Sequence, residues 1–288
     1  MIGIFDSGVG GLTVVKEVKK KLPGYDLIYF GDTARVPYGN KSAELIKQYA
    51  LEDAQFLLSR GAKLIIVACN TASAVALDYL RANISVPVFG VIQPALQAAL
   101  EMTQNNRVGV IGTRATVNSG AFQKCLLALQ GPDNSIDNRD VQKPAFMRKR
   151  SVKNHSLIKK TKLFFQAAPL LVPLIEENYL DRPETARILK HYLQPLKAEQ
   201  IDTLILGCTH YPIIQSLIEK KLKQVKVINS AERVSQELKD FLGHNQSIDR
   251  SLAKRREARF FVSDLTPHLT DIAKQFLGQR INLEVVEL

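Results

Sequence analysis

Short apolar runs alternate along this chain with stretches in which apolar residues recur at the spacing of an α-helix. Four runs lie in the first third, at 2–5, 27–30, 64–68 and 86–92. Strands that alternate with helices are typical of βαβ units, which place parallel strands in a sheet and helices on its faces. The pattern therefore predicts an α/β fold with mainly parallel sheets flanked by helices.

The same alternation then repeats in the second part of the chain. Its runs lie at 107–112, 163–165, 203–206 and 225–228, and two more follow at 259–262 and 283–286. The repeat predicts two similar domains, and we expect the last two runs to pack back onto the first. The expected boundaries are 1–92 plus 231–288 for the first domain and 93–230 for the second, with the active site in the cleft between them.

Length and cysteine content narrow the class of protein. The 288 residues can bury a full core, and no apolar run approaches the about 18 residues of a membrane span. The first strand-like run begins directly after Met1, which leaves no room for a signal peptide. Three cysteines do not form a secreted disulfide framework, and their spacing is not that of a metal site. We expect a cytoplasmic protein with reduced thiols, no membrane span and no metal.

About half of the net charge of +11 lies in one segment. The stretch from 131 to 165 contains nine Lys and Arg residues but only three Asp residues. We treat it as a basic insertion in the second domain. Blocks of like charge are most often solvated loops. Binding of an acidic protein or nucleic acid through 143–162 is the alternative. With the segment interpreted as a solvated loop, we expect no direct contact with nucleic acid.

Two cysteines, Cys69 and Cys208, each stand where a strand-like run stops and a polar turn begins. A lone cysteine there is most often a small buried hydrophobe. The carboxyl ends of parallel strands, however, face the functional crevice, so two such thiols can flank one substrate and move a proton at carbon. Both precede an expected helix start, capped after Cys69 by Asn70 or Thr71, and this position favours anions and a lowered thiol pKa. Cys125 lacks such a setting and is predicted to pack within a helix.

A glycine-rich turn, Asp6-Ser7-Gly8-Val9-Gly10-Gly11, follows the first run. Asp32 ends the second run where a ribose-binding acid would sit, but Thr13 stands in place of the third glycine of a dinucleotide fingerprint. Asp6 would also oppose a pyrophosphate, so a small ligand is favoured. Asp6 is then expected to accept a hydrogen bond from an ammonium group, and Ser7 to donate one to a carboxylate.

Other polar residues leave two interpretations open. Thr113 and Thr116 follow a strand and either offer hydroxyls to an anion or cap a helix. His210, two residues after Cys208, either stabilises a thiolate or holds the turn. Glu176 would ordinarily be a surface carboxylate.

The motifs taken together resemble those of glutamate racemases, cofactor-independent members of the aspartate/glutamate racemase superfamily. They are Asp6 to Leu12, Pro37-Tyr38-Gly39, Ala68-Cys69-Asn70-Thr71, Gly112-Thr113, Val172-Pro173-Leu174-Ile175-Glu176-Glu177 and Gly207-Cys208-Thr209-His210-Tyr211-Pro212. They span nearly the whole chain in the family's order. The resemblance implies two α/β domains, an active site between them, no cofactor, and production of D-glutamate for bacterial peptidoglycan.

By position, the resemblance makes Cys69 and Cys208 the two proton donors or acceptors, Cys69 toward D-glutamate and Cys208 toward L-glutamate. It implies substrate contacts at Asp6, Ser7, Tyr38, Gly39, Asn70, Thr71, Thr209 and His210. Thr113, Thr116 and Glu176 are weaker candidates. Two features depart from the family: Ala168 stands where a cysteine is usual, and the basic segment 131–165 is longer than the norm.

Racemisation needs a base on one face of the α-carbon and an acid on the other, and two cysteines satisfy that symmetry. The coupled pair predicts a bell-shaped pH–rate profile. The alternatives are a racemase of the same superfamily that acts on aspartate or a related acid, and a regulator that binds a partner through the basic segment. Some glutamate racemases inhibit DNA gyrase, so a gyrase contact is an expected second role, and a homodimer is a further expectation.

Overall fold

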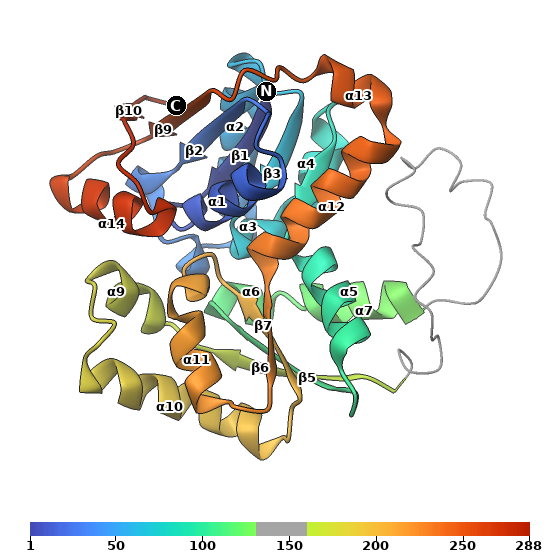
Figure 1. The fold of residues 1–288 in the computed structure, drawn as a ribbon, viewed down its shortest axis with the longest axis vertical. Coiled ribbons are helices and arrows are strands. Elements are labelled where there is room, and N and C mark those ends of the chain that lie inside the picture. Colours follow the sequence, from blue (N-terminus) through green and yellow to red (C-terminus); the bar gives the residue numbers. More distant parts are fainter. Residues whose placement is uncertain (131–159) are drawn as a thin grey trace.

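The computed structural model describes residues 1–130 and 160–288, and places two parallel sheets one above the other (Figure 1). The upper sheet has the strand order β10-β9-β2-β1-β3-β4. Its strands are β1 (Ile2–Asp6), β2 (Leu27–Gly31), β3 (Leu64–Val67), β4 (Val88–Gly90), β9 (Ala258–Val262) and β10 (Leu283–Val285). The last two strands of the chain thus extend the sheet that the first four begin.

The lower sheet has the order β6-β5-β7-β8. Its strands are β5 (Arg107–Gly112), β6 (Lys162–Ala167), β7 (Thr203–Gly207) and β8 (Lys226–Asn229). In chain order this is second-first-third-fourth, which is also the order of β1 to β4 in the upper sheet. All the strand pairs among the described residues are parallel, so the sequence repeat corresponds to a repeated topology.

This topology fixes where a ligand would bind. In a sheet of order 2-1-3-4, the chain reverses its direction of winding between the first and third strands, and a crevice opens at their carboxyl ends. The upper switch point lies between β1 and β3, which end at Asp6 and Val67. The lower one lies between β5 and β7, which end at Gly112 and Gly207.

Helices cover both faces of each sheet. In the first part of the chain they are α1 (Leu12–Lys21), η1 (Thr33–Arg35), η2 (Tyr38–Asn40), α2 (Ala43–Ser59), α3 (Asn70–Val75), α4 (Leu77–Asn83) and α5 (Ile92–Met102). The remaining ones are α6 (Arg114–Asn118), α7 (Ala121–Gln130), α9 (Leu171–Glu176), α10 (Pro183–Ala198), η5 (Tyr211–Ile214), α11 (Gln215–Lys221), α12 (Ser230–His244), α13 (Gln246–Ser251) and α14 (Pro267–Leu277). Among the described helices, none is long and apolar enough to cross a membrane.

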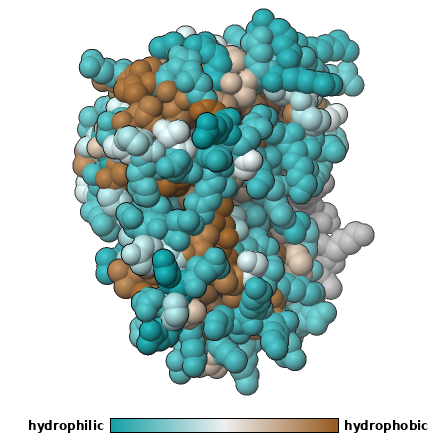
Figure 2. All heavy atoms as spheres, turned by 60° about the vertical axis from the view of Figure 1, so that its left-hand side comes forward, coloured by the Kyte–Doolittle hydropathy of each residue, from teal (hydrophilic) through white to brown (hydrophobic). Residues whose placement is uncertain are grey.

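One apolar core joins the two sheets. It contains Ile2 and Ile4 of β1 together with Leu204 and Leu206 of β7, all fully buried. Helix α12 contributes Val234 and other apolar residues to the same core, and it packs against both α1 and α5. Hydrophilic side chains cover most of the face shown in Figure 2, with apolar residues in a band near its centre. The two sheets are therefore packed into one body.

The local expectations had different outcomes. The run 86–92 forms only the short strand β4, because Pro87 lacks an N–H and Ile92 already begins α5. The helix start expected after Cys208 is confirmed, with Pro212 in the first turn; this turn is the 3₁₀ helix η5, and the chain becomes α-helical at Gln215. Most of the basic insertion, 131–159, lies outside the described residues.

Candidate active site

Cys69 lies just beyond β3 and is itself the N-cap of α3. Its Sγ accepts a hydrogen bond from the N–H of Ala72 at 3.4 Å, so the cap is neither Asn70 nor Thr71. The Cys69 thiol in turn donates to Ser7 Oγ at 3.5 Å. Ser7 follows β1, so the upper switch point brings together the first glycine turn and the first cysteine.

The expected lowering of the Cys69 pKa is wrong for the structure as it stands. Burial removes the thiol from water, and the carboxylate of Asp6 adds to this effect, so that the pKa of Cys69 rises to about 12. The N–H of Ala72 and the Ser7 hydroxyl act in the opposite direction but are outweighed. Cys69 is therefore a neutral thiol in this state, and the cap position alone does not make it a base.

Cys208 has a different environment. It follows β7, and its Sγ lies 3.8 Å from Nδ1 of His210. The other ring nitrogen of His210, Nε2, lies 2.9 Å from Oε1 of Glu176 at the end of α9. Burial by itself lowers the pKa of His210, but the hydrogen bonds to Cys208 and Glu176 outweigh it and raise the pKa to about 10. A charged imidazolium therefore faces the sulfur of Cys208, an arrangement that favours a thiolate.

Asp6 and Thr209 join the two switch points. Asp6, at the end of β1, is fully buried and accepts hydrogen bonds from the N–H of Gly8 at 3.1 Å and from Thr209 Oγ1 at 3.3 Å. Burial raises the pKa of Asp6, while the charge of His210 lowers it in part. Thr13 of α1 donates to the carbonyl oxygen of Thr209 at 2.9 Å. These contacts hold the loop after β1 against the loop after β7.

Gly10 makes this close approach possible. A Cβ at this position would lie 2.5 Å from Nδ1 and 2.6 Å from Cε1 of His210, which is inside van der Waals contact. The glycine of the first turn is therefore needed because the imidazole of the second motif packs on its Cα, not because a phosphate does.

Three threonine hydroxyls form a cluster beyond the ends of β3 and β5. Thr71 Oγ1 lies 2.9 Å from that of Thr113 and 3.3 Å from that of Thr116, and the latter two are 2.9 Å apart. Thr113 also accepts from the N–H of Thr116 and so caps α6. The two interpretations of Thr113 are thus compatible, since one hydroxyl both caps the helix and joins the cluster.

Asn70 offers a further polar group. It is only 3% exposed, and its Oδ1 is buried without a hydrogen-bond partner in the described part of the chain. Asn70, Cys208 and Thr209 line one narrow crevice that has no room for a water molecule. A buried acceptor without a donor costs about 1–3 kcal/mol, so Asn70 is suited to a ligand that donates a hydrogen bond.

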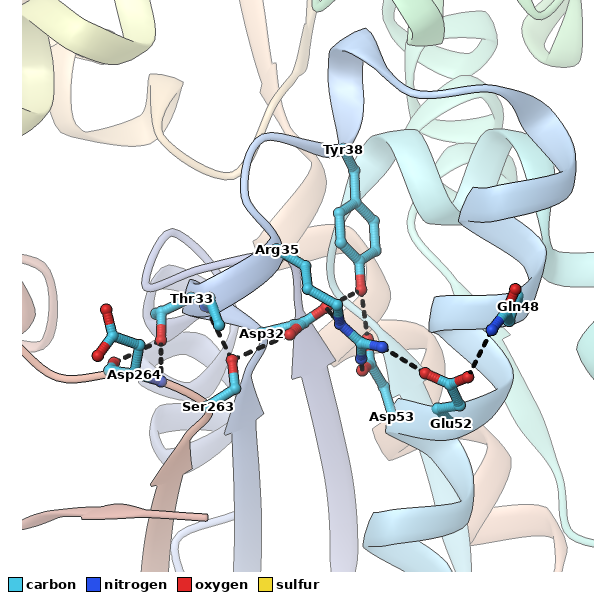
Figure 3. Close-up of polar contacts among 10 residues, drawn as sticks. Asp32, Thr33, Arg35, Tyr38, Gln48, Glu52, Asp53, Ser263 and Asp264 are labelled. Carbon is cyan, nitrogen blue, oxygen red and sulfur yellow. Dashed lines mark hydrogen bonds and ion pairs between the residues drawn. The ribbon is translucent and has the colours of Figure 1, made fainter. Parts of the chain in front are cut away.

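The turn at Tyr38 and Gly39 lies against Thr113. A Cβ on Gly39 would be 3.2 Å from that of Thr113, so the backbone of the turn reaches the hydroxyl cluster. The Tyr38 side chain is buried, and its hydroxyl contacts Asp32 and Asp53 (Figure 3). Asp32 is used inside this network and is not free for a ribose.

The third cysteine, Cys125, has the packing role that its sequence predicts. Cys125 is partly buried on α7, where it packs against the apolar cluster around Phe122.

Sequence reasoning missed the pairing of Glu176 with His210 and gave no role to Thr13 or Asp53. Among the residues the structure describes, no group of His, Cys, Asp and Glu has the arrangement of a metal site.

Comparison with known proteins places this site in a family. The model of the Asp/Glu/Hydantoin racemase family matches residues 12–237. The glutamate racemase of Aquifex pyrophilus is 42% identical over 286 residues, which cover 99% of this chain and 97% of that protein. The chain therefore belongs to the Asp/Glu/Hydantoin racemase family.

Solved structures agree over the full length. A glutamate racemase isoform from Bacillus anthracis superposes with a TM-score of 0.84 at 36% identity, covering 100% of this chain and 97% of the other. The glutamate racemase of Francisella tularensis, solved with D-glutamate, has a TM-score of 0.81 at 35% identity, with coverage of 99% and 97%. The α/β fold with two parallel sheets is thus the fold of these enzymes.

Proposed function

We propose that this protein is a glutamate racemase that interconverts L- and D-glutamate and supplies D-glutamate for peptidoglycan. The observation that carries the proposal is the presence of two unlike thiols at facing switch points. Cys69 is at the upper one and Cys208 at the lower one, and Asn70, which follows Cys69, lines the same crevice as Cys208. Relatives about 40% identical over nearly the whole chain are glutamate racemases, which supports this substrate.

The unlike environments prepare the pair for one direction of reaction. Cys208 faces the charged His210 and is suited to be the thiolate base, whereas Cys69 is a neutral thiol and is suited to be the acid. With L-glutamate, Cys208 takes the α-proton, and Cys69 gives its proton to the opposite face of the α-carbon. The product is D-glutamate, and the reaction leaves Cys208 as a thiol and Cys69 as a thiolate. The reverse reaction starts from that state.

The charged groups of the substrate have matching side chains at the ends of β1, β3 and β7. The hydroxyls of Ser7, Thr71 and Thr209 are suited to a carboxylate, on which negative charge builds as the α-proton leaves. The unpartnered Oδ1 of Asn70 and the carboxylate of Asp6 are suited to the substrate ammonium. Because Asp6 and Asn70 are buried, these contacts act away from bulk water, where they are stronger.

The substrate assignment is tested by the optical rotation or circular dichroism of L-glutamate and L-aspartate incubated with the enzyme. We expect turnover of L-glutamate, and a loss of net racemisation by at least about a thousandfold in Cys208→Ala, because the base is removed. Cys125→Ala is the matched control and should retain wild-type rates. Dominant turnover of aspartate would contradict the substrate, and near-normal racemisation by a folded Cys208→Ala would contradict the mechanism.

The remaining expectations concern location and partners. We propose a cytoplasmic enzyme, which the reduced thiols and the family support. The homodimer and the contact with DNA gyrase remain predictions. The segment expected to make the gyrase contact, 143–162, falls largely outside the described residues.

A further inference from the structure

Tyr38 is predicted to contact substrate, yet its hydroxyl is directed into the protein. The side chain is 1% exposed, and its oxygen lies 2.5 Å from Oδ2 of Asp32 and 2.9 Å from Oδ2 of Asp53. Figure 3 shows the ring running from the η2 turn down to these two carboxyls, which come from the end of β2 and from α2. The backbone of the turn, at Gly39, packs against Thr113 of the hydroxyl cluster.

The two contacts cannot both be donated by Tyr38, because a phenol carries one hydrogen. If both carboxyls were ionised, one pair of oxygens at hydrogen-bond distance would have no proton between them. Both contacts are satisfied only when one of the two carboxyls is protonated and donates to the phenol oxygen. The geometry therefore requires one additional proton in this cluster.

The other partners decide which carboxyl carries this proton. Asp32 also accepts hydrogen bonds from Nε of Arg35 at 2.6 Å and from the Ser263 hydroxyl at 2.9 Å, so it is well satisfied as a carboxylate. Among the described residues, Asp53 accepts only from Nη2 of Arg35, at 3.0 Å on Oδ1, besides its contact with the shared phenol. Burial, followed by the charge of Asp32, raises the pKa of Asp53 well above its ordinary value. The proton therefore belongs on Oδ2 of Asp53.

We propose that Asp53 is a positioning residue that is held as a neutral carboxylic acid and donates its proton to Tyr38, which fixes the turn at 38–40 against Thr113. Tyr38 donates in turn to Asp32, so the chain of hydrogen bonds has one direction. The kinetic consequences rest on the proposed racemase function. The protonation of Asp53 does not depend on that function, and the pH dependence of the melting temperature measures it separately.

The charged and titratable groups around Asp53 come from several elements. They are Tyr29 of β2, Asp32 after β2, Arg35 of η1, Tyr38 of η2 and Glu52 of α2. Because the folded-state pKa of Asp53 is raised, the native protein binds a proton that the unfolded chain has already lost at neutral pH. The contribution of Asp53 to stability therefore falls as pH rises from its unfolded pKa of about 3.9 toward its folded value.

Asp53→Asn tests the proposal directly, because an amide reproduces a neutral acid: its oxygen accepts from Arg35 and its nitrogen donates to Tyr38. We expect kcat/KM for glutamate within about twofold of wild type. The difference in melting temperature, variant minus wild type, should increase with pH between 6 and 9. Asp32→Asn is the matched control, in which an amide replaces a true carboxylate, and it should lose at least about tenfold in kcat/KM.

Asp53→Leu and Tyr38→Phe complete the set. Each breaks the chain of hydrogen bonds, so KM for glutamate should rise by about tenfold with a smaller change in kcat. If Asp53→Leu does not fold, the kinetics of Asp53→Asn and Tyr38→Phe still test the proposal. The proposal is overturned if Asp53→Asn loses as much activity as Asp32→Asn, or if its melting temperature follows wild type at every pH. If the wild type fails to racemise glutamate, the proposed function fails, and the melting temperatures still test the protonation of Asp53.

Discussion

His210 is the residue whose surroundings most clearly distinguish the two thiols. Its ring lies between Cys208 and Glu176, and both favour its charged form. The ring also packs edge-on against Phe276 of α14, with the centroids 5.3 Å apart, so it is held from the side as well. A fixed imidazolium beside one sulfur is the physical reason for assigning the base to Cys208 in the resting enzyme.

Glu176→Gln tests this assignment. Without the carboxylate, the pKa of His210 should fall from its raised value, because one of the two groups that favour its charged form is neutral. The alkaline limb of the pH profile of kcat/KM for L-glutamate should then move to lower pH, and kcat should fall by about tenfold or more.

The neighbouring residue supplies the control for that prediction. Glu177 has a largely exposed side chain, and its partner is His268 rather than His210. Its Oε1 lies 3.8 Å from Nε2 of His268. Glu177→Gln should leave the pH profile where it is. An alkaline limb that stays in place in Glu176→Gln, or moves equally in both variants, would show that Glu176 does not set the charge of His210.

At the scale of elements, the contact between the loop before α1 and the loop after β7 holds the site together. Gly10→Ala would push a methyl group into the imidazole of His210, where overpacking costs about 1–3 kcal/mol. We expect a lower free energy of unfolding by this amount in urea denaturation, together with a loss of racemisation.

Gly243→Ala is the control for this substitution. Gly243 lies in the last turn of α12, and a Cβ there would meet nothing within 4 Å. Alanine should therefore stabilise the helix by about 0.5–1 kcal/mol and leave activity unchanged. Equal effects of the two substitutions would mean that the loops do not pack as closely as the structure shows.

The sequence was sufficient for elements whose signal is local. Alternating apolar runs predicted the parallel strands of both sheets, and the polar turns after β3 and β7 predicted where the thiols lie. The pairing of Glu176 with His210 was not accessible, because 34 residues separate them and a glutamate near a helix end looks like any surface carboxylate. Asp53 gave no signal either, since one aspartate in an amphipathic helix does not reveal that it is buried.

At the scale of the whole molecule, two copies of one topology face each other through their switch points. Each copy supplies one thiol, and the hydrogen bonds from Thr13 to Thr209 and from Thr209 to Asp6 close the crevice between them. In the proposed mechanism, a proton leaves one face of a bound carbon and returns on the other, because each face meets a different half of the fold. The proposed mechanism therefore depends on each half of the fold supplying the thiol for one face of the α-carbon.

The most direct test of that claim is solvent-deuterium exchange at the α-carbon in single-cysteine variants. In deuterated water, Cys208→Ala should still exchange the α-hydrogen of D-glutamate through Cys69 but not that of L-glutamate. Cys69→Ala should show the opposite preference, and neither variant should give net racemisation. Exchange of the same enantiomer by both variants, or of both enantiomers by either one, would contradict a site in which each thiol serves one face.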